Sequence, residues 1–213
     1  MKLYGYFRSS AAYRVRIALN LKGLAPEHAF VHLRKGEQQA AAYAALNPQK
    51  FVPALETDDG ALLTQSLAIV EYLDEVHPHP ALLPADPADR ARVRAIALAV
   101  ACDIHPLNNL RVLKHLGKAL GLDEEARNAW YRHWIAEGFD ALEAMLANDP
   151  RTGRFCHGDQ PTLADVFLVP QVSNAERFDC DLTPYPTVVR IAAAARALPA
   201  FADAAPERQP DAE

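Results

Sequence analysis

The sequence predicts a chain in two parts, an α/β first part with the order βαβ–α–ββα and an all-helical second part. Three observations indicate this division. Segments typical of strands and of helices alternate as far as Val76. Four prolines then fall within residues 77–89, which excludes a continuous helix there. Beyond them, most apolar residues recur at helical spacing. We expect domains at 1–78 and 89–213, joined by a proline-rich linker at 79–88.

The first part begins with a predicted strand at residues 2–7, which are rich in the aromatic side chains that favour a pleated sheet. Ser9 or Ser10 is expected to cap the helix that follows, because a serine hydroxyl accepts a hydrogen bond from an N–H of the first turn. A second strand is predicted at 27–33 and an alanine-rich helix at 37–46.

A hairpin comes next, with strands predicted at 51–57 and 61–63. Asp59-Gly60 is its turn, since this dipeptide readily adopts positive φ. A helix over 67–76 is expected to follow, with Ser66 as its cap. These elements complete the first part.

The second part is predicted to start with one helix from Ala88 to about Leu116, kinked at Pro106. A long helix over 124–146 follows. Thr162 and Asp165 form a variant of the capping box and predict another, buried helix.

A final helix is predicted from Tyr185-Pro186 to about Leu198. From Pro206 the sequence is polar and contains prolines, so we expect this end to be loose.

Charge and composition exclude several classes of function. The net charge of −5 argues against a general nucleic-acid binder, and no apolar run reaches the length of a membrane span. Three cysteines without metal-type spacing are typical of reduced thiols, so we expect a cytoplasmic protein. Cys102 and His105 lack a second ligand pair, so no metal site is predicted.

The serine turn is the strongest candidate for chemistry. Five cations and no acid precede Glu27, which indicates that an anion is bound in this region. A strand that delivers hydroxyls to a helix N-terminus can hold an anion or a thiolate. No cysteine lies near this turn, so a thiol there is expected to come from a cofactor. An ordinary capped junction between a strand and a helix fits the same residues.

Five blocks of sequence resemble the zeta-class glutathione transferases and together span nearly the whole chain. They are Ser9-Ser10 followed by Tyr13-Arg14-Val15-Arg16-Ile17-Ala18-Leu19; Asn47-Pro48 with Val52-Pro53; Gln65-Ser66-Leu67-Ala68-Ile69; Asp103-Ile104-His105-Pro106-Leu107-Asn108-Asn109; and Ala175-Glu176-Arg177-Phe178 before Asp181-Leu182-Thr183-Pro184-Tyr185-Pro186. The resemblance implies the glutathione-transferase fold, with a thioredoxin-like N-terminal domain and an all-helical C-terminal domain. It also implies a homodimer.

The resemblance implies glutathione as cofactor and a glutathione-dependent cis–trans isomerase of maleylpyruvate or maleylacetoacetate, in the breakdown of aromatic compounds or tyrosine. Two other functions stay open. One is a broader glutathione transferase or α-haloacid dehalogenase that uses the same thiolate, and the other is a non-catalytic module of this fold. The substrate of the isomerase is a small dicarboxylate, which arginine suits through paired hydrogen bonds.

By resemblance, several residues are expected to bind glutathione. Ser10 is the expected hydroxyl donor to the thiol, with Ser9 as the alternative, and the backbone N–H of Ala11 lies in the same turn. The remaining expected contacts are Val52 through its backbone beside a cis Pro53, Gln65 and Ser66 at the γ-glutamyl carboxylate, Gln49 or Lys50 at the glycyl end, and Asn108 and Asn109.

Four residues are expected to bind the carboxylates of the substrate. They are Arg8 and Arg177 first, then Arg111 and His105, and Arg8 is also counted as catalytic beside the serines. Arg14 and Arg16 are expected to be structural. The family often carries Ser-Ser-Cys-Ser in this turn, whereas this chain has Ser9-Ser10-Ala11-Ala12. The sequence therefore leaves the thiol of glutathione as the nucleophile.

Overall fold

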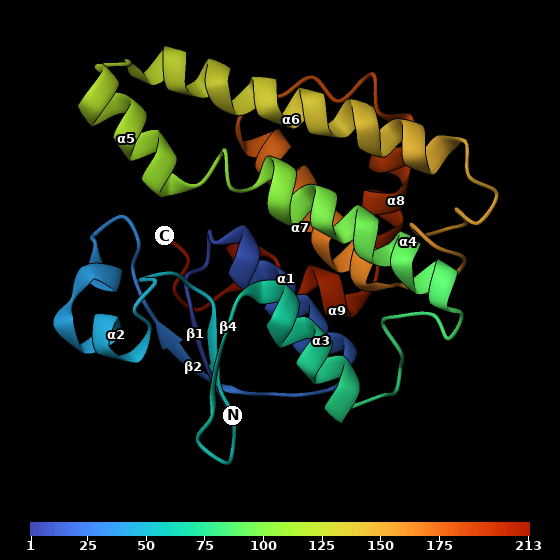
Figure 1. Ribbon diagram of the computed structural model, residues 1–213, viewed down its shortest axis with the longest axis horizontal. Coiled ribbons are helices and arrows are strands. Elements are labelled where there is room, and N and C mark those ends of the chain that lie inside the picture. Colours follow the sequence, from blue (N-terminus) through green and yellow to red (C-terminus); the bar gives the residue numbers. More distant parts are fainter. The chain divides into compact units, whose positions relative to one another are not determined.

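A computed structural model describes residues 1–213, which divide into two compact units (Figure 1). Unit 1 comprises Met1–Leu82 together with Ala197–Glu213, and unit 2 comprises Leu83–Arg196. The change of unit near residue 82 falls in the predicted linker. Residues 197–213 differ from the predicted division, because they pack with unit 1.

Unit 1 is built on a four-stranded mixed sheet with the strand order β2-β1-β3-β4. Strand β1 (Lys2–Gly5) is parallel to β2 (Glu27–Phe30) and antiparallel to β3 (Ala54–Glu56). Strand β4 (Leu62–Thr64) completes the hairpin with β3. The predicted order of strands and helices is confirmed, and the sheet has the thioredoxin-like arrangement.

Helices cover the two faces of this sheet because successive residues of a strand point to opposite sides. On one face, Gly5 approaches Ala12 of α1 (Ser10–Leu21), which packs against α3 (Ser66–Val76). The other face is covered by α2 (Ala41–Leu46) (Figure 1). The Tyr4 ring contacts the Tyr43 ring of this helix, with 6.1 Å between their centroids. A 3₁₀ turn at Glu37–Gln39 precedes α2.

Residues 197–213 complete unit 1 through contacts with α1. The short helix α9 (Pro199–Ala202) packs on α1, and Phe201 is fully buried. The Tyr13 hydroxyl donates to the Phe201 carbonyl oxygen at 3.3 Å, and Arg16 Nε donates to the Ala204 carbonyl oxygen at 2.9 Å. The expectation of a loose end from Pro206 was wrong, because a 3₁₀ turn at Pro206–Arg208 and side-chain hydrogen bonds beyond it order this segment.

Unit 2 is all-helical, as predicted. The single helix expected over 88–116 is instead α4 (Pro87–Leu98), a π-helical turn (Ala99–Ile104) and α5 (Leu110–Leu120). Pro106 accounts for the break, since proline has no N–H to continue the helix. The chain resumes with Asn109 as the new cap, whose Oδ1 accepts from Arg111 N at 3.0 Å.

The remaining helices of unit 2 are α6 (Glu124–Ala147), α7 (Leu163–Arg177) and α8 (Pro186–Arg196). Helix α7 packs against both α4 and α8 and forms the buried centre of the unit. The predicted capping box is present, with Thr162 as the N-cap and Asp165 in the first turn. None of these helices combines the length and the apolar character that a membrane span requires.

Candidate active site

The serine turn lies where the predicted strand and helix meet. Ser9 is the N-cap of α1, and its Oγ accepts from Ala12 N at 3.1 Å. Ser10 is the first residue of the helix and is 7% exposed, whereas Ser9 and Ala11 are half-buried. The positive end of the helix dipole therefore converges with two hydroxyls, which favours a bound anion or thiolate.

The backbone just before this turn is fixed by Arg16, which is 6% exposed. Its Nη2 donates to the Phe7 carbonyl oxygen at 3.1 Å and its Nη1 to the Tyr6 carbonyl oxygen at 3.5 Å. Arg16 thus has the structural role predicted for it, although as a buried group. The half-buried Arg8 follows Phe7, with its guanidinium carbon 5.0 Å from the centroid of that ring.

The loop before β3 carries the predicted cis peptide bond, between Val52 and Pro53. Val52 lies two residues before β3 and is 7% exposed. The buried Asn47 organises this loop, because its Nδ2 donates to the Phe51 carbonyl oxygen at 2.9 Å and its Oδ1 accepts from Gln49 N at 3.0 Å. Sequence reasoning used Asn47 only as part of a motif and missed this supporting role.

Gln65, and not Ser66, is the N-cap residue of α3, so the predicted cap was wrong. Gln65 has φ 69°, a strained backbone for a residue other than glycine. Its side chain makes no capping bond, and its Nε2 donates to Gln49 Oε1 at 3.1 Å. Ser66 begins the helix, and its Oγ accepts from Arg14 Nη1 at 3.2 Å. The structure therefore brings together Gln49 and Gln65, two of the predicted glutathione contacts.

In unit 2, Arg177 is the last residue of α7. Its Nη2 donates to Asn174 Oδ1 at 3.1 Å, and its guanidinium carbon lies 5.1 Å from the centroid of the Phe178 ring. The Tyr131 ring stacks on Phe178 with 3.6 Å between centroids, and burial raises the pKa of Tyr131 to about 12. Arg177 is thus placed by stacked aromatic rings and an amide rather than by a carboxylate.

The other predicted residues of unit 2 lie around the start of α5. His105 is in the turn after the π-helical segment, and Arg111 is an exposed residue of α5. Asn108 is 6% exposed, and its Nδ2 donates to the Tyr131 carbonyl oxygen at 3.3 Å. The Asn109 side chain is occupied as the helix cap.

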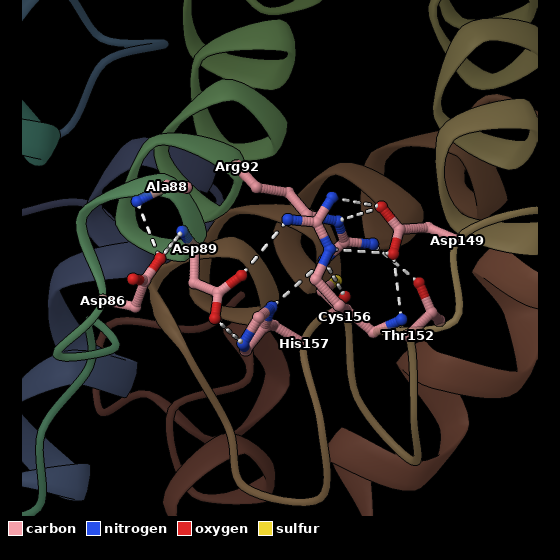
Figure 2. Close-up of polar contacts among 9 residues, drawn as sticks. Asp86, Ala88, Asp89, Arg92, Asp149, Thr152, Cys156 and His157 are labelled. Atoms are coloured by element: carbon pink, nitrogen blue, oxygen red, sulfur yellow. Dashed lines mark hydrogen bonds and ion pairs between the residues drawn. The ribbon is translucent and has the colours of Figure 1, made fainter.

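A second polar cluster, which sequence reasoning did not single out, lies in unit 2 (Figure 2). Arg92 of α4 donates to Asp149 Oδ2 at 2.8 Å, Thr152 Oγ1 at 2.7 Å and the Cys156 carbonyl oxygen at 2.7 Å. His157 Nε2 lies 3.8 Å from Asp89 Oδ2. The cluster contains none of the predicted site residues and fixes the loop between α6 and α7. The structure holds no group of three or more metal-ligating side chains.

A mixed sheet with a cis-proline ahead of β3, a capped helix at the serine turn and a separate all-helical unit define a protein of the glutathione-transferase fold. Residues 8–76 match the N-terminal domain of glutathione S-transferase, and residues 124–206 match its C-terminal domain. The chain belongs to the glutathione S-transferase family, in its zeta class.

Individual relatives are similar over the whole chain. It is 56% identical over 211 residues to the maleylpyruvate isomerase of a Ralstonia species, with 99% of each chain covered. A holo structure of a zeta-class maleyl pyruvate isomerase is similar with TM-score 0.98, 55% identity and 100% of both chains covered. A maleylacetoacetate isomerase from Methylobacterium extorquens AM1, with bound malonate and glutathione, is similar with TM-score 0.97, 46% identity and 100% of both chains covered.

Proposed function

We propose that this protein is a glutathione-dependent cis–trans isomerase that converts maleylpyruvate or maleylacetoacetate into the fumaryl isomer. The observation that carries the proposal is the serine turn, a helix N-terminus with two hydroxyls beside Arg8 and without a cysteine. The names of its relatives support the same reaction.

The reaction needs a thiolate as a temporary nucleophile. The glutathione sulfur adds to one alkene carbon of the maleyl group, and the electron pair of the π bond moves onto the conjugated carbonyl oxygen as an enolate. Rotation about the resulting carbon–carbon single bond follows. The enolate then re-forms the alkene as the trans isomer and expels the thiolate, so the reaction neither gains nor loses protons or electrons.

The serine turn stabilises the thiolate form of glutathione in this proposal. A free thiol has a pKa of about 8.5, and a helix N-terminus lowers it. We place Ser9 before Ser10 as the hydroxyl donor. Ser9 Oγ already accepts from Ala12 N, which leaves its proton to donate, and Ser9 is more exposed than Ser10. The backbone N–H of Ala11 belongs to the same turn.

The other groups of unit 1 hold the glutathione chain in this proposal. Val52, beside the cis Pro53, pairs with its peptide backbone, and Gln65 with Ser66 at the N-terminus of α3 binds the γ-glutamyl carboxylate. Gln49 or Lys50 binds the glycyl end. Gln49 already contacts Gln65. Asn108 and Asn109 add further glutathione contacts from unit 2.

Arginines bind the dicarboxylate substrate in this proposal. Arg177 and Arg8 each offer a planar pair of N–H donors that matches a carboxylate. Arg111 and His105 are secondary contacts. The malonate in the Methylobacterium relative is also a small dicarboxylate, and it supports a substrate of this class. We also propose that the protein is a homodimer and works in the cytoplasm.

The test is an absorbance assay of each maleyl acid, with and without glutathione. We expect fast conversion only with glutathione, and the ratio of kcat/KM values identifies the substrate.

Ser9→Ala should lower kcat by about a hundredfold, and Ser10→Ala by much less. Arg177→Met should raise KM for the maleyl acid while KM for glutathione stays unchanged. Bound glutathione without conversion of either acid would contradict the isomerase and favour a transferase or dehalogenase.

A further inference from the structure

We propose that Asp211 is a positioning residue that fixes the serine turn from the far end of the chain. The inference rests on the proposed function, because it concerns the turn that is to hold the glutathione thiolate. Asp211 does not touch glutathione or the substrate in this proposal. It acts through the backbone of Phe7, the residue that precedes Arg8.

The geometry joins the two ends of unit 1 directly. Asp211 Oδ2 accepts from the backbone N–H of Phe7 at 3.0 Å, across 204 positions of sequence. The carbonyl oxygen of Phe7 accepts from Arg16 Nη2 at 3.1 Å. Ser9 N in turn donates to the Tyr6 carbonyl oxygen at 2.9 Å. Both polar backbone groups of Phe7 are therefore fixed one residue before Arg8 and two before Ser9.

The segment 206–213 is held firmly enough to carry this role. Gln209 Nε2 donates to the carbonyl oxygens of Asp203 and Ala205, both at 2.9 Å. Beyond Asp211, Glu213 Oε1 lies 2.7 Å from His32 Nε2. Asp211 thus lies between two residues with hydrogen bonds of their own. Its carboxylate accepts from the backbone of Phe7, which is buried with 4% of its surface exposed.

Toward a thiolate in the serine turn, the charge of Asp211 gives no benefit. It does help to keep the buried Arg16 charged, because it opposes the lowering of the Arg16 pKa by burial. A negative charge near the serine turn opposes a thiolate and a dianionic substrate. A hydrogen bond to a charged acceptor, however, is about twice as strong as a neutral one. The benefit of Asp211 is therefore the fixed backbone, which holds the hydroxyls of the turn at the distance and angle that thiolate stabilisation requires.

Three variants separate position from charge. Asp211→Ala removes both the hydrogen bond and the charge. Asp211→Asn removes only the charge, because its amide oxygen can still accept from Phe7 N–H. Glu213→Gln is the matched control, since it changes a carboxylate of the same segment that contacts His32 and not the turn. The readouts are the pKa of the bound glutathione thiol, from its ultraviolet absorbance against pH, and kcat, each corrected for the folded fraction.

The thiol pKa should shift in opposite directions if Asp211 acts by positioning the turn or by its charge. We expect Asp211→Ala to raise the thiol pKa by about one unit and to lower kcat about tenfold. Asp211→Asn should keep the thiol pKa at or slightly below the wild-type value, and Glu213→Gln should match wild type. If Asp211→Ala and Asp211→Asn both lower the thiol pKa, Asp211 acts through its charge and the inference is wrong.

Two further outcomes concern stability and the proposed reaction. A lower melting temperature for Asp211→Ala, with wild-type thiol pKa and kcat per folded molecule, would also overturn the inference. Wild-type protein that lowers the thiol pKa but isomerises neither maleyl acid would contradict the proposed reaction. The rise in thiol pKa of Asp211→Ala would in that case still support the positioning role. An ordinary thiol pKa in wild type would overturn both.

Discussion

Two loop residues in different units, Phe7 and Cys156, are held by the same pair of contacts. In each, the backbone N–H donates to a carboxylate and the carbonyl oxygen accepts from a guanidinium. The partners are Asp211 and Arg16 for Phe7, and Asp165 and Arg92 for Cys156. Both arrangements fix a loop against a helix, and both carbonyl-binding arginines have little exposed side chain.

The two arrangements differ in what surrounds them. Asp165 is fully buried and accepts three hydrogen bonds, whereas Asp211 is half-buried. Arg92 also pairs with Asp149 (Figure 2), whereas Arg16 donates to carbonyl oxygens, and burial lowers its pKa to about 10. The contacts of Phe7 hold the backbone directly before the serine turn. The contacts of Cys156 hold a loop that contains no predicted site residue. The arrangement at Phe7 therefore supports the candidate site, and the arrangement at Cys156 supports only the fold of unit 2.

The largest effect is expected at Asp165. Asp165→Ala leaves Cys156 N, Thr162 N and Thr162 Oγ1 without their acceptor inside the protein. Each such loss costs on the order of 1–3 kcal/mol, so the free energy of unfolding should fall by about 4 kcal/mol. Chemical denaturation measures this, and a loss below about 1 kcal/mol would show that the Cys156 loop does not depend on the carboxylate.

Arg16→Met should have the next largest effect, and on two properties. It orphans the carbonyl oxygens of Phe7 and Ala204, for a loss of about 3 kcal/mol in the free energy of unfolding. It should also weaken glutathione binding about tenfold, because the backbone before Ser9 is released. Titration calorimetry with glutathione measures the second effect, and unchanged affinity in the folded variant would argue that the turn holds its shape without Arg16.

Arg92→Met is the matched variant in unit 2. It removes the donors to Thr152 and Cys156, and we expect a loss of about 2 kcal/mol in the free energy of unfolding. Glutathione affinity should stay at the wild-type value, since no predicted glutathione contact lies in this cluster. If Arg92→Met weakened glutathione binding as much as Arg16→Met, the two arrangements would not differ in their effect on the candidate site.

The smallest effect concerns pH. Hydrogen bonds from Arg151 and Arg92 hold the pKa of Asp149 well below its usual range. The unfolded value is about 3.9, so this carboxylate stabilises the fold above about pH 4, and the contribution is lost as the pH falls through the lower folded pKa. Asp149→Asn should therefore flatten the decline of the melting temperature between about pH 4 and pH 2. If the melting temperature of Asp149→Asn fell with pH as steeply as that of wild type, groups other than Asp149 would cause the loss of stability in acid.

Local patterns predicted much of the fold. The strand and capped helix around Ser9, the Asp59-Gly60 hairpin and the capping box at Thr162 all depend on residues a few positions apart, and the structure contains each of them. Two errors are local, namely the helix break at Pro106 and the cap at Gln65. The loose end expected from Pro206 was wrong because distant groups order it. Glu143 of α6 accepts from the first N–H groups of α8, and no local signal in the sequence indicates this cap.

The site divides in the same way. The serine hydroxyls predicted a helix cap at Ser9 or Ser10, and the resemblance implied a cis bond at Pro53 and a helix start at Gln65 and Ser66. The structure has the cap at Ser9, the cis bond and the helix start. Their roles toward glutathione stay predictions. Asp211 escaped prediction because its partner is 204 positions away, and its polar, proline-containing segment is typical of a loose end.

Unit 1 is made of two stretches of chain separated by the whole of unit 2. A ribosome therefore makes Phe7 early and its acceptor Asp211 only after it has translated the whole of unit 2. The sheet and α1 can form on the nascent chain, but the Phe7 N–H gains its Asp211 acceptor only after unit 2 has been translated. The serine turn, which is translated early, thus gains this hydrogen bond late, and a chain shortened before residue 211 would carry every serine-turn residue without this support.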